Sequence, residues 1–213
     1  MGKERKATWR EAVARKGFIA VLLATSGAGL ALAWALPRFF GWLNVRPGKM
    51  PHDPLLANLG PFDLSVPIFV VLYGVLAAMV LVLAGRPFRL LHGLLAYVGM
   101  VALRMACMAL FTLEPPPRMV PLIDPFTQGF YPGAQPFAKD LFFSGHTATM
   151  VLLALLAPKG CWRWATAAAA AFVGAGVLLQ HVHWSMDVLA AVPAAWLCYA
   201  VAGRLLNRWG LRS

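Results

Sequence analysis

Six apolar stretches limit the folds open to this chain more than any other feature of its sequence. Most of them approach the ~20 residues with which an α-helix crosses a hydrocarbon layer about 30 Å thick. A segment inside that layer must satisfy its own backbone polar groups, which a helix does. We therefore predict an all-α polytopic membrane protein, a bundle of six transmembrane helices. The stretches are roughly residues 17–37, 65–84, 90–112, 142–158, 164–182 and 184–206.

The fourth stretch, 142–158, is short and begins with polar residues, so we expect it to lie inside the bundle. Composition agrees with a membrane protein. Of the 213 residues, 60% are hydrophobic and 13% are charged, whereas soluble domains average about 45–50% apolar and about 25% charged residues. With no repeat in the sequence, we expect one integral membrane domain over 1–213. Its first 16 residues form a basic cytoplasmic arm.

The segment Ala31-Leu32-Ala33 also resembles a signal-peptide cleavage site behind a basic region. We favour an uncleaved first helix.

The formal net charge is +11, which in a soluble chain would point to a nucleic-acid partner. Here the distribution of charge argues for a membrane instead. If the N-terminus is cytoplasmic, the inner segments hold thirteen of the nineteen basic residues and the outer segments hold five. This is the positive-inside pattern, so we predict that both termini are cytoplasmic. The basic ends then meet anionic lipid headgroups, and no nucleic-acid partner is expected. Short loops and spans rich in Ala and Leu favour a bacterial inner membrane.

Chemically competent side chains gather at the outer level of this topology. His146 begins the fourth stretch, His183 lies between the fifth and sixth, and Asp187 follows four residues later. If the sixth helix begins near residue 183, His183 and Asp187 share one helix face. The carboxylate can then orient the imidazole as a nucleophile or base. His146 is the matching general acid. The alternative is that these are solvated residues at helix ends.

Several neighbouring residues could serve the same site. Ser144 and Gly145 suit a helix N-cap, where exposed N–H groups favour a phosphate. Arg104 lies inside the third stretch, where an arginine is costly and is a functional candidate for binding phosphate or a carboxylate. A structural ion pair, or an arginine reaching outward, is the alternative. His181 and His183 could be metal ligands, but no Cys or further Glu/His cluster accompanies them, so no metal or other cofactor is expected.

Two outer loops are long, 38–64 and 113–141. The second cannot form a long helix because it contains seven prolines, and a loop of this length is often functional. We expect it to act as a lid over the site. The three cysteines show no metal or redox spacing, and no disulfide is expected. The prolines are Pro115, Pro116, Pro117, Pro121, Pro125, Pro132 and Pro136.

Three segments resemble the type 2 phosphatidic acid phosphatase (PAP2) superfamily, and within it the sphingomyelin synthase-like branch. "DLFFSGHTATM" at 140–150 resembles Asp-x-x-x-Ser-Gly-His-Thr, and "HVHWSMDV" at 181–188 resembles His-x-His-Tyr-Thr/Ser-Ile-Asp-Val. "RMACMALFTLEPPP" at 104–117 is similar to an Arg segment ending in Thr-Leu-Pro, with Glu114 before the prolines. The resemblance covers residues 104–191. The matching residues of the first two segments are Asp140, Ser144, Gly145, His146, Thr147, His181, His183, Ser185, Asp187 and Val188.

The resemblance implies a lipid phosphotransferase with a catalytic triad of His146, His183 and Asp187. His183 would form a phosphohistidine, Asp187 would orient it, and His146 would protonate the departing lipid alcohol and deprotonate the incoming one. The residues expected to bind substrate are Arg104, Glu114, Asp140, Ser144, Gly145, Thr147 and His181.

The branch follows from what the sequence lacks. Superfamily phosphatases add a Lys-x6-Arg-Pro motif and an Arg six residues before the second His, where this chain has Val177. A dianionic monoester would need those paired cations. A zwitterionic phosphodiester needs fewer and tolerates carboxylates such as Glu114 and Asp140. Ala138-Lys139 replaces the Cys-Gly that precedes the motif in the animal synthases.

We therefore predict transfer of phosphocholine or phosphoethanolamine from a glycerophospholipid to a lipid alcohol such as ceramide. A hydrolase of the same mechanism, a PAP2-type lipid phosphatase or phosphodiesterase, is the close alternative. A transporter or metal-binding membrane protein is a further alternative. It would be expected to have broken helices or a repeat, neither of which the sequence shows.

Overall fold

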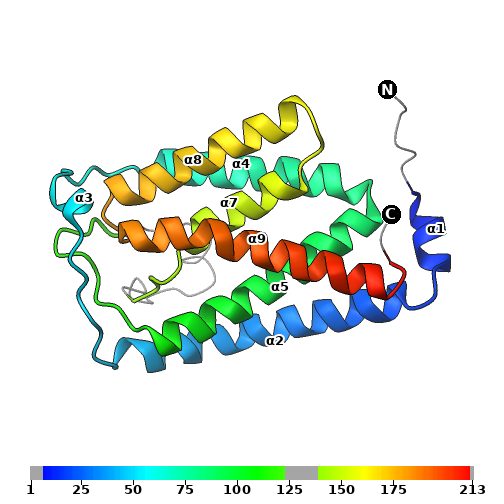
Figure 1. Ribbon diagram of the computed structural model, residues 1–213, viewed down its shortest axis with the longest axis horizontal. Coiled ribbons are helices and arrows are strands. Elements are labelled where there is room, and N and C mark those ends of the chain that lie inside the picture. The colour runs from blue at the N-terminus through cyan, green and yellow to red at the C-terminus, as the bar shows by residue number, and fades with distance from the viewer. Residues whose placement is uncertain (1–6, 123–138, 212–213) are drawn as a thin grey trace.

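The computed structural model describes residues 7–122 and 139–211, and all of its regular elements are helices (Figure 1). The fold is that of an integral membrane protein. Five helices are long and apolar enough to cross a membrane, namely α2, α4, α5, α8 and α9, and α7 is a shorter apolar helix. The helices are α1 (Trp9–Ala14), α2 (Phe18–Asn44), α3 (Pro54–Ala57), α4 (Ser65–Ala84), α5 (Pro87–Leu110), α7 (Gly145–Leu156), α8 (Cys161–Leu179) and α9 (Ser185–Arg208).

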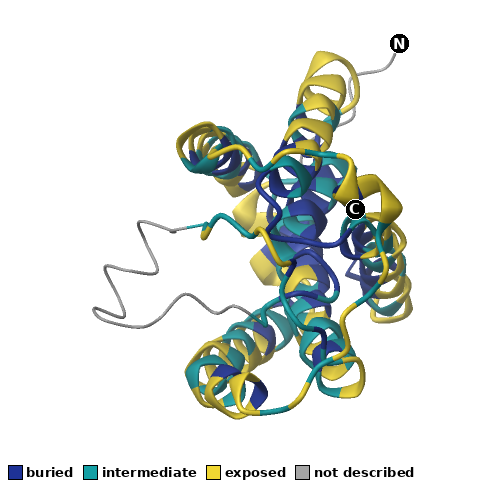
Figure 2. Ribbon diagram, turned by 90° about the vertical axis from the view of Figure 1, so that its left-hand side faces the viewer, coloured by how far each residue is buried: buried dark blue, intermediate teal, exposed yellow. Residues whose placement is uncertain are grey.

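The shortest apolar helix, α7, lies at the centre of the bundle. It packs against α4, α5, α8 and α9, and seen from one end the buried residues lie inside while exposed residues face outward (Figure 2). Its 12 residues span about 18 Å, well short of a ~30 Å hydrocarbon layer. The expectation that this stretch is internal is confirmed. Its buried side chains include Met150, Leu152, Leu153 and Leu156.

The first long helix extends further than the sequence indicated. We expected it to end near residue 37, but α2 continues through Pro37 to Asn44. Proline removes one backbone donor from the helix. In an apolar medium, however, the other backbone groups keep their helical partners because no water competes for them. The predicted loop 38–64 therefore holds the end of α2 and also the short helix α3, which Asp53 caps at its N-terminus.

Two loop segments join at the end of the bundle that carries α3. Lys49 and Leu113 form an isolated parallel bridge, with hydrogen bonds from Lys49 N to Thr112 O at 2.9 Å and from Glu114 N to Lys49 O at 2.9 Å. Gly48 lies so close that a Cβ there would be 2.6 Å from the carbonyl carbon of Leu113. Most of the expected lid, residues 123–138, lies outside the described residues.

The helix α1 and the end of α9 lie together at the opposite end of the bundle (Figure 1). The Arg15 side chain donates to Gly210 O at 3.2 Å. Beneath this contact Ala12, Phe18, Leu206 and Leu211 form a buried cluster. The three cysteines of the chain are free thiols.

Candidate active site

The turn between α8 and α9 holds His183 and places it beside Asp187. His183 Nδ1 lies 3.4 Å from Asp187 Oδ2, and the same oxygen accepts the backbone N–H of Trp184 at 3.0 Å. His183 is 3% exposed and Asp187 is fully buried. The expectation of a shared helix face is wrong, because α9 begins at Ser185 and His183 precedes its N-cap, Trp184. The Asp187 side chain accepts the backbone N–H of the N-cap residue and so caps α9. This capping contact, in place of a shared helix face, brings Asp187 next to His183.

The carboxylate of Asp187 is unevenly engaged. Its Oδ2 makes both contacts, whereas the buried Oδ1 has no hydrogen-bond partner among the described residues. A buried carboxylate with so few donors strongly favours a positive charge nearby. Asp187 can therefore stabilise an imidazolium on His183 and hold the proton on Nδ1, leaving Nε2 as the reactive nitrogen.

His146 comes to the same place from α7. Its ring centre lies 6.4 Å from that of His183, with the rings tilted by 63°. On its other side it meets Phe69 of α4, with ring centres 6.0 Å apart. A single tetrahedral group bonded to one imidazole and hydrogen-bonded to the other matches such a gap, given hydrogen bonds of about 2.7–3.2 Å. The structure thus brings together two histidines that are far apart in the sequence.

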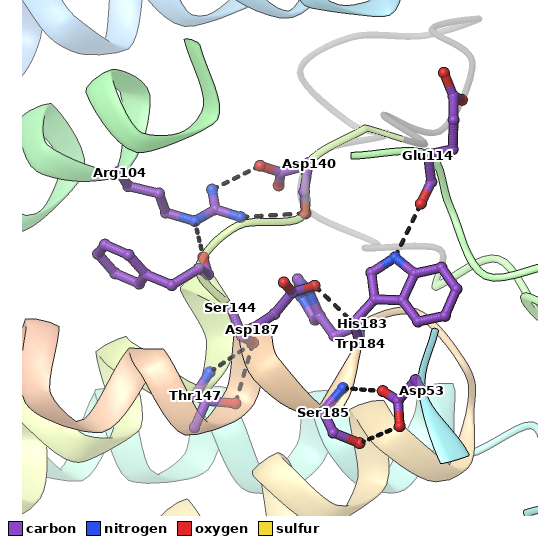
Figure 3. A network of polar contacts seen from close by, with 11 residues as sticks. Asp53, Arg104, Glu114, Asp140, Ser144, Thr147, His183, Trp184, Ser185 and Asp187 are labelled. Atoms are coloured by element: carbon purple, nitrogen blue, oxygen red, sulfur yellow. Dashed lines mark hydrogen bonds and ion pairs between the residues drawn. The ribbon is translucent and has the colours of Figure 1, made fainter. Parts of the chain in front are cut away.

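Backbone contacts fix the start of α7 against the start of α9 (Figure 3). Ser144 N donates to Asp187 O at 3.0 Å. The Ser144 side chain caps α7, accepting from Thr147 N at 3.4 Å and lying 3.1 Å from Thr147 Oγ1. The predicted N-cap is confirmed. Ser144 and Thr147 are buried and contact each other, so they position His146. The backbone N–H groups of the first turn of α7 point out of the N-terminal end of the helix, toward the histidine pair.

Arg104 of α5 organises the segment that leads into α7. Its guanidinium pairs with Asp140 Oδ1 at 2.6 Å and donates to Phe143 O at 2.6 Å and to Asp140 O at 3.2 Å. Gly145 permits this approach, since a Cβ there would lie 3.0 Å from Arg104 Cζ. A planar guanidinium suits such a multiple contact. The structure thus engages Arg104 with a protein carboxylate.

Glu114 also has protein partners. Its Oε1 accepts from Lys139 Nζ at 2.8 Å and from Gly48 N at 2.7 Å, and these hydrogen bonds, that from Lys139 first, lower the pKa of the carboxyl. Its carbonyl oxygen accepts from Trp184 Nε1 at 2.9 Å. Glu114 is therefore ionised. Its backbone carbonyl oxygen holds the indole of Trp184, the residue next to His183. The two carboxylates expected to face a cationic headgroup, Glu114 and Asp140, each carry a basic partner.

His181 is held away from solvent by the loop before α4. It is 2% exposed, adopts a left-handed backbone with φ of 58°, and its Nε2 lies 3.1 Å from Leu59 O. Burial is the main cause that lowers its pKa, although the Leu59 contact opposes this. A neutral imidazole in this setting fixes the turn that presents His183. The structure gives His181 a positioning contact.

Two positioning residues were missed by sequence reasoning. Asp53 accepts from Ser185 N at 2.7 Å and from Ser185 Oγ at 3.1 Å, so it caps α9 as well as α3. Gln180 is fully buried, with its amide donating to Ser65 Oγ at 2.7 Å and accepting from Leu64 N at 3.1 Å. The Asp53-Pro54 pair is a recognisable helix start. Its second partner, 132 residues away, leaves no local signal.

Metal-ligating side chains do not cluster in the described parts of the chain. Within residues 7–122 and 139–211, no group of three His, Cys, Asp or Glu side chains is arranged to hold a metal ion. What the structure does bring together is a pair of histidines and a buried carboxylate.

Residues 139–203 match the family model described as PAP2 superfamily C-terminal. The matched segment runs from Lys139 through α7 and α8 into α9, and so contains His146, His183 and Asp187. The superfamily resemblance is thereby confirmed over this segment, which indicates a lipid phosphatase or phosphotransferase type of activity acting in a bilayer. No curated protein and no solved structure matched the chain.

Proposed function

We propose that the protein is a membrane phosphotransferase that moves phosphocholine or phosphoethanolamine from a glycerophospholipid to a lipid alcohol such as ceramide or diacylglycerol. The observation that carries this proposal is the pair of imidazoles 6.4 Å apart, one of them backed by the buried Asp187. Such a pair can hold one phosphoryl group between a nucleophile and a general acid.

The proposed reaction has two steps. His183 Nε2 attacks phosphorus, and the bond from phosphorus to the diacylglycerol oxygen breaks as His146 gives that oxygen its proton. The phosphohistidine carries the headgroup, and Asp187 stabilises the charge on its ring. The hydroxyl of the acceptor lipid then gives its proton to His146 and attacks phosphorus. The phosphorus–nitrogen bond breaks, and His183 returns to its starting state.

The remaining site residues support this exchange through position and backbone dipoles. The first N–H groups of α7, beginning at Gly145, can donate to the phosphoryl oxygens because a helix N-terminus favours an anion. Arg104 and Asp140 fix the segment before α7 through their ion pair. Ser144, Thr147 and His181 hold the turns that carry the two histidines.

The charge at the site supports a phosphodiester substrate. Among the described residues, Arg104 is already neutralised by Asp140 and Lys139 by Glu114. A dianionic phosphate monoester would require cations that are not committed in this way. A phosphodiester carries a single negative charge on its phosphate group and therefore needs fewer cations at the site. This reasoning supports the sphingomyelin synthase-like branch.

We further propose that the site faces the periplasmic or exoplasmic side and that both termini are cytoplasmic. The turn between α8 and α9, which carries His183, lies at the end of the bundle opposite the Arg15–Gly210 contact. The excess of basic residues on the termini side supports that orientation. A bacterial inner membrane fits the short loops and the composition of the spans.

The test is product analysis in mixed micelles. Purified protein is incubated with labelled phosphatidylcholine or phosphatidylethanolamine, with and without ceramide, and lipids are separated by chromatography. We expect a new labelled lipid that forms only with the acceptor and disappears in His183→Ala. A variant distant from the site, Arg204→Gln, is the control. Release of water-soluble headgroup or phosphate alone would replace the transferase with the hydrolase, and full activity of His183→Ala would refute the nucleophile.

A further inference from the structure

An apolar groove runs along the bundle between α8 and α9, with α7 as its floor. The two outer helices meet at the end that carries the histidines and diverge toward the other end, exposing α7 between them (Figure 1). The space enclosed is about 750 Å³. It is lined mostly by apolar side chains, among them Val151, Leu155 and Val192. A groove of this kind in a membrane protein faces lipid tails.

The side of the groove that α8 forms consists largely of small residues. Those lining it are Ala167, Ala170, Ala171, Gly174 and Ala175. From Trp164 to Leu178, which both line it, α8 rises about 21 Å. That length exceeds half of a ~30 Å hydrocarbon layer. If the groove were empty, side chains of all three helices would lose dispersion contacts. One extended hydrocarbon chain along the groove would supply them.

The wide end of the groove carries positive charge and an aromatic ring. Arg163 and Trp164 line it there, and Lys159 is exposed in the turn just before α8. Basic residues between helices at a membrane surface bind anionic headgroups, and tryptophan favours the same level. The other titratable group lining the groove is the phenol of Tyr199. The positive charge at this end of the groove therefore favours an anionic headgroup.

The narrow end of the groove reaches the back of the candidate active site. A Cβ placed on Gly174 would lie 3.4 Å from Val188 Cγ1 and 3.5 Å from Thr147 Cγ2, so the three helices approach one another closely at this level of the groove. Thr147 contacts the Ser144 side chain, and Val188 follows Asp187 in α9. A chain filling the groove would thus support the residues that position His146 and Asp187.

We propose that this groove binds one acyl chain of an anionic bilayer phospholipid, with the phosphate held by Arg163 and Lys159. The headgroup lies at the end opposite the histidines, so this lipid is distinct from the proposed substrate. The site does not depend on the proposed reaction. A substrate chain would instead need its charged head at the narrow end, where the lining polar group is the buried Thr147. A helix from a second copy would leave Arg163 without an anion.

The proposal can be tested by native mass spectrometry of detergent-purified protein. Delipidated protein is mixed with phosphatidylglycerol or phosphatidylcholine, and the fraction that retains one lipid is measured. We expect selective retention of phosphatidylglycerol. Arg163→Gln should lower retention about fivefold, the factor that corresponds to roughly 1 kcal/mol per basic residue near a membrane surface. Ala171→Phe should lower it by filling the groove.

The matched controls are Arg204→Gln, an exposed arginine outside the groove, and Ala168→Phe, an exposed alanine that does not line it. Both should retain phosphatidylglycerol as the natural sequence does. Equal retention of the two lipids, or retention unchanged in Arg163→Gln, would overturn the assignment. A dimer that Ala171→Phe converts to monomer without any lipid effect would assign the groove to a second copy. If Ala171→Phe does not fold, Arg163→Gln alone decides.

Discussion

At the scale of single residues, the site rests on buried polar groups that hold one another. The capping role of Asp187 explains why it stands four residues after His183 although the two do not share a helix. Its backbone oxygen accepts from Ser144 and its side chain accepts from Trp184. One residue therefore joins the turn carrying His183 to the helix carrying His146. Its charge and its hydrogen bonds have separable roles.

Asp187→Asn separates them. The amide oxygen can still accept the Trp184 N–H, so the fold should persist, but the negative charge that favours an imidazolium on His183 is lost. In the Ser-His-Asp triad of the serine proteases the corresponding change costs about 10⁴ in kcat, and we expect a loss on the order of 10³-fold or more here. Turnover of labelled phospholipid and the thermal unfolding midpoint measure the two effects. An asparagine variant with near-normal kcat would remove the charge from the mechanism.

Gly145 tests the packing beneath Arg104. In Gly145→Ala the new Cβ would lie 3.0 Å from Arg104 Cζ and 3.2 Å from Nε. The guanidinium must shift although three contacts to Asp140 and Phe143 hold it, which should cost about 1–3 kcal/mol as overpacking does. The midpoint of unfolding in detergent should fall, and activity with it.

The matched control for this change is Gly99→Ala in α5, where a Cβ meets nothing within 4 Å. Alanine there should be neutral or slightly stabilising because it favours the helix. Equal effects of the two substitutions would show that Gly145 is not needed for the Arg104 contact.

At the scale of elements, a short helix in a loop holds the start of a long one. Asp53 accepts from Leu56 N at 3.0 Å in α3 and from Ser185 N at 2.7 Å in α9. A single carboxylate thus satisfies first-turn donors of both helices, groups that otherwise lack intrahelical partners. The turn with His183 lies directly before α9, so this clamp bears on the site.

Asp53→Asn should lower stability by about 1 kcal/mol at neutral pH, because an amide offers one acceptor oxygen in place of two and cannot cap both helices. Burial raises the pKa of Asp53, but its hydrogen bonds from Ser185 and Leu56 outweigh this and lower it below 3.8. The stabilisation is therefore present above pH 3.8 and is lost as the pH falls through the lowered folded-state value. Unfolding midpoints measured from neutral pH down to about pH 3 should show the two proteins converging in acid.

The control is Asp63→Asn, whose carboxylate bonds only Ser65 in an exposed loop among the contacts described. It should leave activity unchanged, whereas Asp53→Asn should lower kcat. A constant difference between Asp53→Asn and the natural sequence at every pH would contradict the ionised clamp.

Elements were predictable to the extent that their signals are local. Apolar length located α4, α5, α8 and α9, and the Ser144 cap could be read from the residues that follow it. The end of α2 could not, because Pro37 normally ends a helix and only the apolar surroundings let it continue. The start of α9 was predicted within one residue, but the capping contact of Asp187 could not be told in the sequence from a shared helix face with His183. The Asp53–Ser185 contact depends on folding across 132 residues.

At the scale of the whole molecule, a contact between residues near the two ends of the chain determines whether the number of helix crossings is odd or even. The Arg15–Gly210 contact places both termini at one end, and the chain must then cross the bundle an even number of times. Five helices are long enough to span a membrane, and we infer that the short helix α7, with the segments beside it, supplies one further traverse. The helix α7 begins at Gly145, toward the end of the bundle where α8 ends and α9 begins (Figure 1).

This arrangement predicts opposite exposure of the two ends to a membrane-impermeant thiol reagent. Cys161 is exposed at the start of α8, on the termini side, and in a chain with Cys107 and Cys198 replaced by Ala it is the one reactive thiol. With the proposed cytoplasmic termini, Cys161 should be labelled in inside-out vesicles and protected in right-side-out vesicles. Asn58→Cys, placed just after α3 in a chain that also lacks Cys161, should show the reverse. Labelling of both positions from the same side would contradict the traverse by α7.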